Sequence, residues 1–298
     1  MVVDKPKMIS RAGLIGAWVL LFLCLIGSPA VHARPAQVAI LDLGADATAE
    51  HAAEELARVF AGATDFAVVN RAQARAAARG VGYKGSLNLS LEEARDLGAA
   101  VGCDFLIMGE AATVLRSASA RKDYYESYAS LFFVSARTGR LLLWEQPGAE
   151  AVTATEAERA LLAELARRGA RYVELLAQTR ASERDEKLAQ LTRDAPVILD
   201  TPEADTAALR APRPFRRWQP KYTDAAARME AEATVDVLVE IDEQGEVGRV
   251  EVARWAGYGL NEAVVATVRQ MHFFPALRAG TPVAMRALLR YNFRKPKA

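Results

Sequence analysis

One pattern in the sequence has the spacing of a nucleotide-cofactor site. Residues Gly80 to Gly85 match the string G-x-G-x-x-G. In dinucleotide-binding folds this string follows a strand and opens a helix, so that the helix N-terminus meets the pyrophosphate. Here an alanine-rich helical segment precedes the glycines, and Ser86 to Asn88 follow before the next helix start. The string therefore predicts a flexible loop, and no cofactor is expected.

Three carboxylates, Asp42, Asp46 and Glu50, stand close together at the end of the first expected strand. Ligand sites of α/β proteins often lie at that position. Because no base or metal ligand accompanies them in the sequence, we interpret them as loop and helix-start carboxylates, which the helix dipole favours.

Residue types that act as nucleophiles or metal ligands are sparse. His32, His51 and His272 are far apart, so no HExxH motif or neighbouring His pair exists to hold a metal. Cys24 and Cys103 are too few for a disulfide scaffold or a zinc site of the CxxC type. We expect Cys103 to be a small buried residue, with a reactive thiol as the alternative. Since no nucleophile, base and oxyanion site come together, an enzyme is not expected.

Composition places the chain among soluble, core-forming proteins. Hydrophobic residues make up 51% of its 298 residues, and 38 basic residues stand against 37 acidic ones. This composition excludes a disordered tail and a strongly basic nucleic-acid binder. The length has room for two domains.

Residues 1–33 have the three parts of a secretory signal peptide. Basic residues predominate before residue 12, residues 12–27 form an unbroken apolar run, and Val31-His32-Ala33 is a small-x-Ala cleavage pattern. We expect cleavage between Ala33 and Arg34. The alternative is an uncleaved anchor, although the apolar run is shorter than the roughly 20 residues that span a bilayer comfortably.

Strand and helix patterns alternate over residues 36–192 and predict a mixed sheet with flanking helices. A polar, Gly-containing turn at residues 137–140 predicts a hairpin. On the last helix, Glu164 with Arg168 and Glu183 with Lys187 are expected as pairs on the solvent side. The expected strands are 37–43, 66–69, 104–114, 124–134 and 141–144, and the expected helices are 47–60, 72–79, 90–101 and a long segment that a capping box opens at 153.

Residues 193–217 are expected to form a linker of partly extended chain. Prolines interrupt regular elements there, and between Ala207 and Lys221 there are five basic residues and no acidic one. The basic, aromatic end of this segment, residues 213–218, suits nucleic acid or anionic lipid, but export argues against nucleic acid. We favour a solvated linker that leads into a packed Trp218.

Apolar residues alternate over the last 80 or so residues. Every second residue from Val235 to Ile241 is apolar, and Asp242 to Gly245 form a turn, which predicts a hairpin with one buried face. A stripe at helical spacing follows from Leu260 to Met271, and the final strand runs from about Ala284 to Phe293. The predicted order is hairpin, helix, strand.

Several spaced elements in residues 219–293 agree in type and order with a known family. They are Gln219-Pro220-Lys221-Tyr222, Ile241-Asp242-x-x-Gly245-x-Val247, Gly257 with Leu260, Phe273-x-Pro275-Ala276, Gly280-x-Pro282-Val283 and Phe293. On these residues the segment resembles the C-terminal domain of the TonB energy-transducer family. The sequence departs from the family pattern at Thr223, at Ala233 and at Trp255-Ala256, where the family commonly has Pro, Gly and a Ser pair. These departures bear on receptor specificity more than on fold.

The resemblance implies a small β-β-α-β domain that binds its partner by strand addition. In this mode an exposed sheet edge adds an extended segment, the TonB box of an outer-membrane receptor, as a further strand. Backbone groups then supply affinity, and alternate side chains supply selectivity. The residues that the resemblance places near the receptor or on the pairing edge are Gln219, Pro220, Tyr222, Ala287, Leu289 and Tyr291.

A weaker similarity covers residues 36–178. The segments Val38–Leu41, Phe66–Arg71 and Leu97–Gly109 resemble the periplasmic α/β module of the curli-secretion CsgG family and the related amino-terminal domain of TolB. No long amphipathic membrane hairpins accompany them in the sequence. The resemblance therefore implies an envelope protein-binding module and not a channel.

These observations predict a non-enzymatic, two-domain α+β or α/β protein of the periplasm. Its parts are a signal peptide or anchor at 1–33, an α/β domain at 36–192, a linker at 193–217 and a TonB-like domain at 218–298. The expected partner is an outer-membrane receptor or another envelope protein, with no nucleic acid, and a homodimer stays open.

The alternative function is an energy transducer anchored in the inner membrane by a single span. It would use a motor complex to couple the proton-motive force to TonB-dependent outer-membrane transport. The span lacks the internal His or charge that marks proton-coupled segments, which weighs against this alternative.

Overall fold

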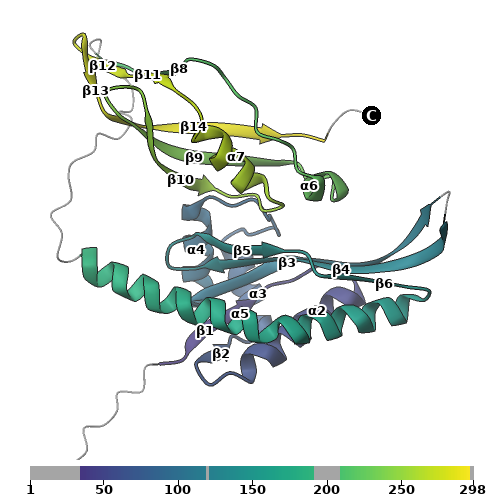
Figure 1. Ribbon diagram of the computed structural model, residues 1–298. Helices are drawn as coiled ribbons and strands as arrows, with labels where there is room; N and C mark the ends of the chain where they lie inside the picture. Colours follow the sequence, from purple (N-terminus) through teal and green to yellow (C-terminus); the bar gives the residue numbers. More distant parts are fainter. Residues whose placement is uncertain (1–33, 119–120, 191–208, 296–298) are drawn as a thin grey trace, which may run out of the picture. The chain divides into compact units, whose positions relative to one another are not determined.

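The computed structural model describes residues 34–118, 121–190 and 209–295 (Figure 1). Pro35–Ala298 form one compact unit. The predicted signal peptide or anchor, with its cleavage site after Ala33, lies outside the described residues, as do residues 193–208 of the predicted linker. Within the described ranges, no helix is long and apolar enough to cross a membrane.

The amino-terminal part is built on a mixed sheet, as the sequence predicts. The strand order is β2-β1-β3-β4-β5, and β6 also pairs with β4. β1 is parallel to both β2 and β3, whereas β3, β4, β5 and β6 pair antiparallel. The strands are β1 (Ala36–Ile40), β2 (Phe66–Val68), β3 (Phe105–Ala118), β4 (Arg121–Ser135), β5 (Leu141–Glu145) and β6 (Gly148–Ala151).

Helices cover both faces of this sheet because side chains of a strand alternate between its faces. Val38 and Ile40 of β1 belong to the core that includes Leu56 and Phe60 of α2 (Ala47–Ala61) and buried residues of α5 (Ala154–Gln190). Ala39 points the other way, into a core shared with α3 (Arg71–Gly80) and α4 (Leu91–Val101). Each fully buried Leu or Phe contributes roughly 1.5–3 kcal/mol to this packing.

Local signals place the helix starts. Ser90 accepts a hydrogen bond from the Glu93 backbone N–H, and the Glu93 carboxylate accepts one from the Ser90 N–H, so the predicted capping box is formed. The side chain of Lys187, the expected partner of Glu183, lies outside the described residues, but Glu183 does not lie on the solvent side as expected. Its carboxylate instead accepts hydrogen bonds from Ser135 and Arg137, at distances of 2.5 and 2.8 Å, and so ties α5 to the β4–β5 turn.

The carboxy-terminal module has the predicted order of hairpin, helix and strand. Its main sheet has the order β10-β9-β14, with β9 in the centre and antiparallel to both neighbours. The buried side chains Val235, Val237, Val239 and Ile241 of β9 face α7 and the core, which accounts for their alternation. The elements are α6 (Asp224–Arg228), β9 (Ala233–Ile241), β10 (Val247–Arg254), α7 (Leu260–Val268) and β14 (Met285–Phe293).

Five short strands complete this module and include part of the predicted linker. β8 pairs with β11, and β12 pairs with both β7 and β13. Residues 209–214, which the sequence analysis assigned to the linker, therefore pair with strands that follow α7. The short strands are β7 (Leu209–Arg210), β8 (Arg213–Pro214), β11 (Phe273–Phe274), β12 (Ala276–Arg278) and β13 (Thr281–Val283).

Trp255, just after β10, is buried against the amino-terminal sheet. Its side chain is only 1% exposed, and its ring centroid lies 5.8 Å from that of Phe132 on β4. The indole N–H donates to the Gly139 carbonyl oxygen at 3.0 Å. A buried indole needs such an acceptor, and the β4–β5 turn supplies it.

Asn88 fastens the same end of the sheet through its side-chain amide. Its Nδ2 donates to the carbonyl oxygens of Thr234 and Trp255, at 2.8 and 2.7 Å, and its Oδ1 accepts from the Thr234 N–H at 3.0 Å. The Trp255 N–H also donates to the Leu89 carbonyl oxygen. The loop before α4 thus bonds to the backbone of the carboxy-terminal module at the start of β9 and just after β10.

Gly257 must be glycine for two reasons. Its φ is +70°, in the left-handed region that disfavours side chains. A Cβ there would also lie 2.4 Å from Phe132 Cε1 and 2.9 Å from Trp144 Cδ1, in the amino-terminal sheet. The contact between the two sheets therefore depends on an absent side chain.

We predict that Gly257→Ala destabilises the protein more than Gly280→Ala. Gly280 has a φ of +85°, but a Cβ there meets no atom within 4 Å, so it reports the backbone cost alone. We expect Gly280→Ala to lower the free energy of unfolding by about 1 kcal/mol, and Gly257→Ala by about 2–4 kcal/mol because the crowding adds to it. Urea unfolding of the two variants measures the difference, and equal losses would contradict the packing at Gly257.

Candidate partner-binding site

β14 is an edge strand of the carboxy-terminal sheet. Nine consecutive residue pairs join it to β9, from Met285 opposite Ile241 to Phe293 opposite Ala233, without a register shift. No other strand pairs with β14 among the described residues. An edge of this kind presents unpaired N–H and C=O groups to a further extended chain.

The hydrogen bonds of Asn88 reveal which residues of β14 direct these groups outward. Both the N–H and the C=O of Thr234 bond to Asn88, so they point away from β14. In an antiparallel ladder, such a residue faces a partner whose own backbone groups also point away. Thr234 lies opposite Asn292. By alternation along the unbroken ladder, Leu288 and Arg290 point their N–H and C=O groups to the open edge as well.

The predicted residues Ala287, Leu289 and Tyr291 occupy the alternate positions. Their side chains are half-buried and pack on the core of the module. The Tyr291 hydroxyl lies 3.5 Å from Met271 Sδ. By the same alternation, their backbone groups bond to β9. β14 is an edge strand, as the predicted pairing mode requires, but its outward backbone groups belong to the residues between those three.

The outer face of β14 carries cross-strand polar pairs. Arg290 Nε and Nη2 donate to the two carboxylate oxygens of Asp236 at 2.7 and 2.9 Å, and Arg286 donates to Glu240 at 2.9 Å. Leu288, between the two arginines, is 50% exposed. Directly opposite pairs of this kind stabilise the β9–β14 ladder, and the backbone edge of β14 on the other side stays open.

Gln219 and Tyr222 lie in the segment before α6 and differ in their surroundings. Gln219 is exposed and Pro220 is half-buried. The Tyr222 hydroxyl lies within hydrogen-bond distance of the carbonyl oxygens of Ala226 and Ala231, at 3.1 and 3.0 Å. Burial raises the pKa of Tyr222, so its hydroxyl keeps the proton that it donates. Tyr222 therefore has a structural role, whereas the Gln219 side chain is accessible to a partner.

Residues 218–294 match the family described as Gram-negative bacterial TonB protein C-terminal. The carboxy-terminal module is thus similar in sequence to that family over these residues. No curated protein sequence matches the chain at a significant level. The resemblance of residues 36–178 to the CsgG and TolB modules stays a prediction.

Three solved structures are similar to parts of the chain. The Pseudomonas aeruginosa TonB C-terminal domain is 22% identical, with 32% of this chain and 93% of that one covered and a TM-score of 0.26. A hypothetical protein from Chlamydia trachomatis is 10% identical, with 45% and 95% covered and a TM-score of 0.31. The LpoB C-terminal domain from Salmonella enterica is 14% identical, with 44% and 91% covered and a TM-score of 0.27.

The glycine string and the first carboxylate do come together in the structure. A cavity of about 450 Å³ beyond the carboxyl end of β1, beside Gly109 and Glu110 of β3, is lined by Asp42, Arg75, Tyr83 and Lys84, among others. Arg75 Nε donates to Asp42 Oδ1 at 2.9 Å, so the carboxylate is already paired. As the sequence indicated, the glycines follow helix α3 and do not open a helix. The described part of the chain holds no His, Cys, Asp and Glu group that could bind a metal.

Three more of the residues considered in the sequence, Glu50, His51 and His272, form pairs with neighbouring side chains at the surface. Glu50 accepts a hydrogen bond from Arg71 Nη2 at 2.9 Å, and this partner lowers the pKa of Glu50. His51 lies 2.6 Å from Glu158, which raises the pKa of His51. The His272 ring lies 2.9 Å from the Glu246 carboxylate. Asp46 stands at the N-cap of α2 without a side-chain cap bond.

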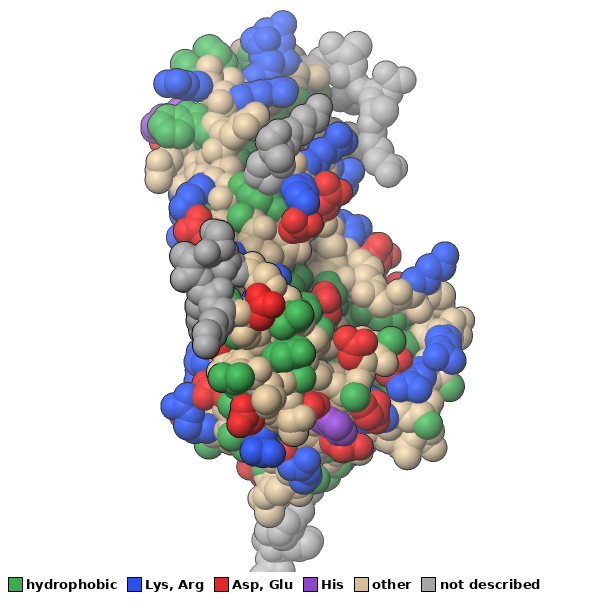
Figure 2. All heavy atoms as spheres, turned by 90° about the vertical axis from the view of Figure 1, so that its right-hand side faces the viewer, with side chains coloured by type: hydrophobic (Ala, Val, Ile, Leu, Met, Phe, Trp, Pro, Cys, Tyr) green, Lys and Arg blue, Asp and Glu red, His purple; other side chains and the backbone are tan. Residues whose placement is uncertain are grey.

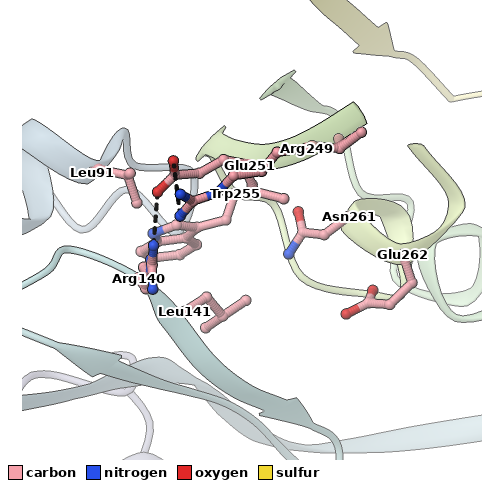
Figure 3. A pocket seen from close by; sticks show the side chains of 10 residues that line it. Leu91, Arg140, Leu141, Arg249, Glu251, Trp255, Asn261 and Glu262 are labelled. Atoms are coloured by element: carbon pink, nitrogen blue, oxygen red, sulfur yellow. Dashed lines mark hydrogen bonds and ion pairs between the residues drawn. The ribbon is translucent and has the colours of Figure 1, made fainter. Parts of the chain in front are cut away.

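A second cavity, of about 300 Å³, lies where β5, β10 and α7 meet (Figure 3). Arg140 Nη2 donates to Glu251 Oε1 at 2.8 Å, and Arg249 approaches the other oxygen at 3.8 Å. Leu91, Leu141 and Trp255 give the cavity apolar walls. Sequence reasoning missed Asn88, Arg140 and Trp255 at this junction. The one available signal was that Trp255 stands where the TonB family commonly has serine.

Cys103 is a half-buried free thiol, not the fully buried residue that the sequence predicted. Burial is the largest cause that raises its pKa to about 12. The thiolate is the reactive form of cysteine. The expectation of a structural residue therefore agrees with its surroundings, whereas a reactive thiol does not.

We predict that Cys103 resists alkylation in the folded protein. A shift of the pKa from 9.0 to about 12 lowers the thiolate fraction about a thousandfold near neutral pH. In a Cys24→Ser chain, which has one thiol left, we expect iodoacetamide to react slowly in buffer and rapidly in concentrated urea. Mass spectrometry follows the modification, and an ordinary rate in buffer would contradict the burial.

Proposed function

We propose that this protein is a non-enzymatic envelope protein whose carboxy-terminal module binds an extended partner segment by adding it as a strand to β14. The observation that carries the proposal is the open, unbroken edge of β14 in a module that matches the TonB C-terminal family. TonB C-terminal domains interact with envelope proteins such as outer-membrane receptors, and the proposed partner is of that class.

The arrangement of the edge supports this mode of binding. Leu288 and Arg290 direct their N–H and C=O groups outward. They are two residues apart, and an added strand forms its hydrogen bonds to every second residue. Leu288 also offers an exposed apolar side chain on the outer face. Gln219 stays an exposed candidate for partner contact.

The remaining parts of the proposal concern location and the amino-terminal part. We place the mature chain in the periplasm, with residues 36–192 as a domain that binds another envelope protein. The alternative is the anchored energy transducer, in which residues 1–33 stay in the inner membrane and contact a motor complex. Strand addition at β14 serves either arrangement.

We predict that Leu288→Pro strongly weakens partner binding, whereas Leu288→Ala retains most of it. Proline removes an outward N–H and places its ring at the edge, but it leaves the bonds to β9 intact. Alanine removes the same side chain and keeps the N–H, which makes it the matched control. The probes are synthetic peptides that cover the periplasm-facing amino-terminal segments of outer-membrane receptors of the source bacterium, and fluorescence anisotropy measures their dissociation constants.

We expect Leu288→Pro to weaken binding about tenfold or more relative to Leu288→Ala. Circular dichroism and urea unfolding check that both variants are folded. Equal binding by the two variants would refute the edge assignment. Self-association of the chain that only proline abolishes would identify a second copy as the added strand, and would replace the receptor in the proposal.

The amino terminus of the protein in its native envelope separates the periplasmic form from the anchored one. We expect sequencing of the purified protein to begin at Arg34, because Val31-His32-Ala33 is a cleavage pattern. Intact Met1 in the inner-membrane fraction would instead establish the anchored transducer. The β14 experiment is independent of this result.

A further inference from the structure

The carboxy-terminal module carries a surface cluster that strand addition does not use. Phe215, Phe274 and Trp218 are 62%, 48% and 45% exposed. The prediction of a packed Trp218 is therefore wrong. We call the following six residues the aromatic–arginine patch: Arg213, Phe215, Arg216, Arg217, Trp218 and Phe274.

The aromatic rings of the patch are held in place although they are exposed. The ring centroids of Phe215 and Phe274 are 4.0 Å apart, and the rings are stacked at 22°. Pairing of β8 with β11 places Arg213 opposite Phe274, and the Phe215 N–H donates to the His272 carbonyl oxygen at 2.9 Å. Backbone pairing therefore holds this apolar surface in a fixed, solvent-exposed position. Exposed apolar patches of this kind often mark interaction sites.

The arginines of the patch are charged but have no acidic partner among the described residues. The Arg213 guanidinium lies 5.8 Å from the Phe274 ring centroid, and that of Arg216 lies 5.5 Å from the Trp218 ring centroid. From residue 209 to residue 223 the chain contains five basic residues and no acidic one. Figure 2 shows blue Lys and Arg side chains beside green hydrophobic ones over this module, at the top of the view.

The hydrogen bonds that the side chains of the patch can form limit the chemical class of its partner. Guanidinium groups and the indole N–H only donate hydrogen bonds, and the phenyl rings do neither. The hydroxyl groups of a neutral glycan donate as well as accept hydrogen bonds, and these side chains offer no acceptor for the hydrogen bonds that the glycan would donate. A surface of phosphate oxygens, in contrast, pairs with hydrogen-bond donors and positive charge. An apolar layer next to the phosphates can take up the aromatic rings. Aromatic side chains with arginines favour such membrane interfaces.

We propose that the aromatic–arginine patch binds the surface of an anionic phospholipid bilayer. The arginines pair with lipid phosphates, and Phe215, Phe274 and Trp218 enter the headgroup layer. This function is separate from strand addition at β14.

The test is co-sedimentation with phosphatidylcholine vesicles that contain or lack phosphatidylglycerol. It uses the chain from Arg34, which carries both cores and excludes the apolar run that would bind lipid by itself. We expect binding only to the anionic vesicles, weakening as salt is raised. Arg216→Glu with Arg217→Glu should abolish it, since each arginine contributes about fivefold in affinity. The matched control, Arg95→Glu with Arg159→Glu, makes the same charge change on exposed residues of α4 and α5 and should bind normally.

A second measurement separates ring insertion from charge attraction. Phe215→Ser with Phe274→Ser should weaken binding at every salt concentration, whereas Leu115→Ser, at an exposed leucine of β3, should not. Brominated lipids should quench tryptophan fluorescence in the parent chain, and Trp218→Phe should remove that quenching. Equal loss in the arginine variants and their control, or equal binding to both vesicle types, would overturn the proposal. Binding to isolated cell-wall glycan in place of vesicles would overturn it too.

Discussion

Burial of Trp255 between the two sheets is the interaction on which the arrangement of the protein depends. An indole N–H that leaves water must find an acceptor, and the Gly139 carbonyl oxygen in the β4–β5 turn is that acceptor. The ring also fills space against Phe132. Because Gly257 has no side chain, the following residues approach closely enough for Tyr258 to pack on Phe132 and Trp144.

This junction makes the two edges of the carboxy-terminal sheet unequal. At β10, Arg254 forms a bridge with Ser90, Glu251 pairs with Arg140, and the pairing with β9 has two register shifts. Loop and side chains of the amino-terminal part thus occupy that edge. At β14 the ladder is regular over nine residues, and it ends in open N–H and C=O groups. Edge strands are commonly protected by bulges or by a cover, and here only β10 has such protection.

The exposure of the Phe215 and Phe274 rings follows from the backbone pairing of the short strands. β8 and β11 pair over two residues, which fixes Phe274 at the surface with Phe215 stacked on it. In a loose linker these rings would be free to turn toward a core. Anchoring by backbone hydrogen bonds removes that freedom, so basic and apolar side chains share one surface. An open strand edge and a basic, aromatic surface therefore occur in the same small module.

The sequence alone determined the local elements and their order. The alternation of Val235, Val237, Val239 and Ile241, the Ser90 capping box and the Gly245 turn each follow from periods or spacings of a few residues, so they are legible without the fold. The match of residues 218–294 to the TonB C-terminal family is likewise a match in sequence.

Tertiary structure alone decided which groups these elements present. Trp255 and its acceptor Gly139 are 116 residues apart, and Asn88 and Thr234 are 146 apart. No local pattern encodes such contacts. The same long-range bonds of Asn88 fix the direction of the Thr234 backbone, and hence which β14 residues face outward. A sequence period of two identifies the face of a side chain, but the hydrogen-bonding direction of the backbone depends on which strand lies beside it.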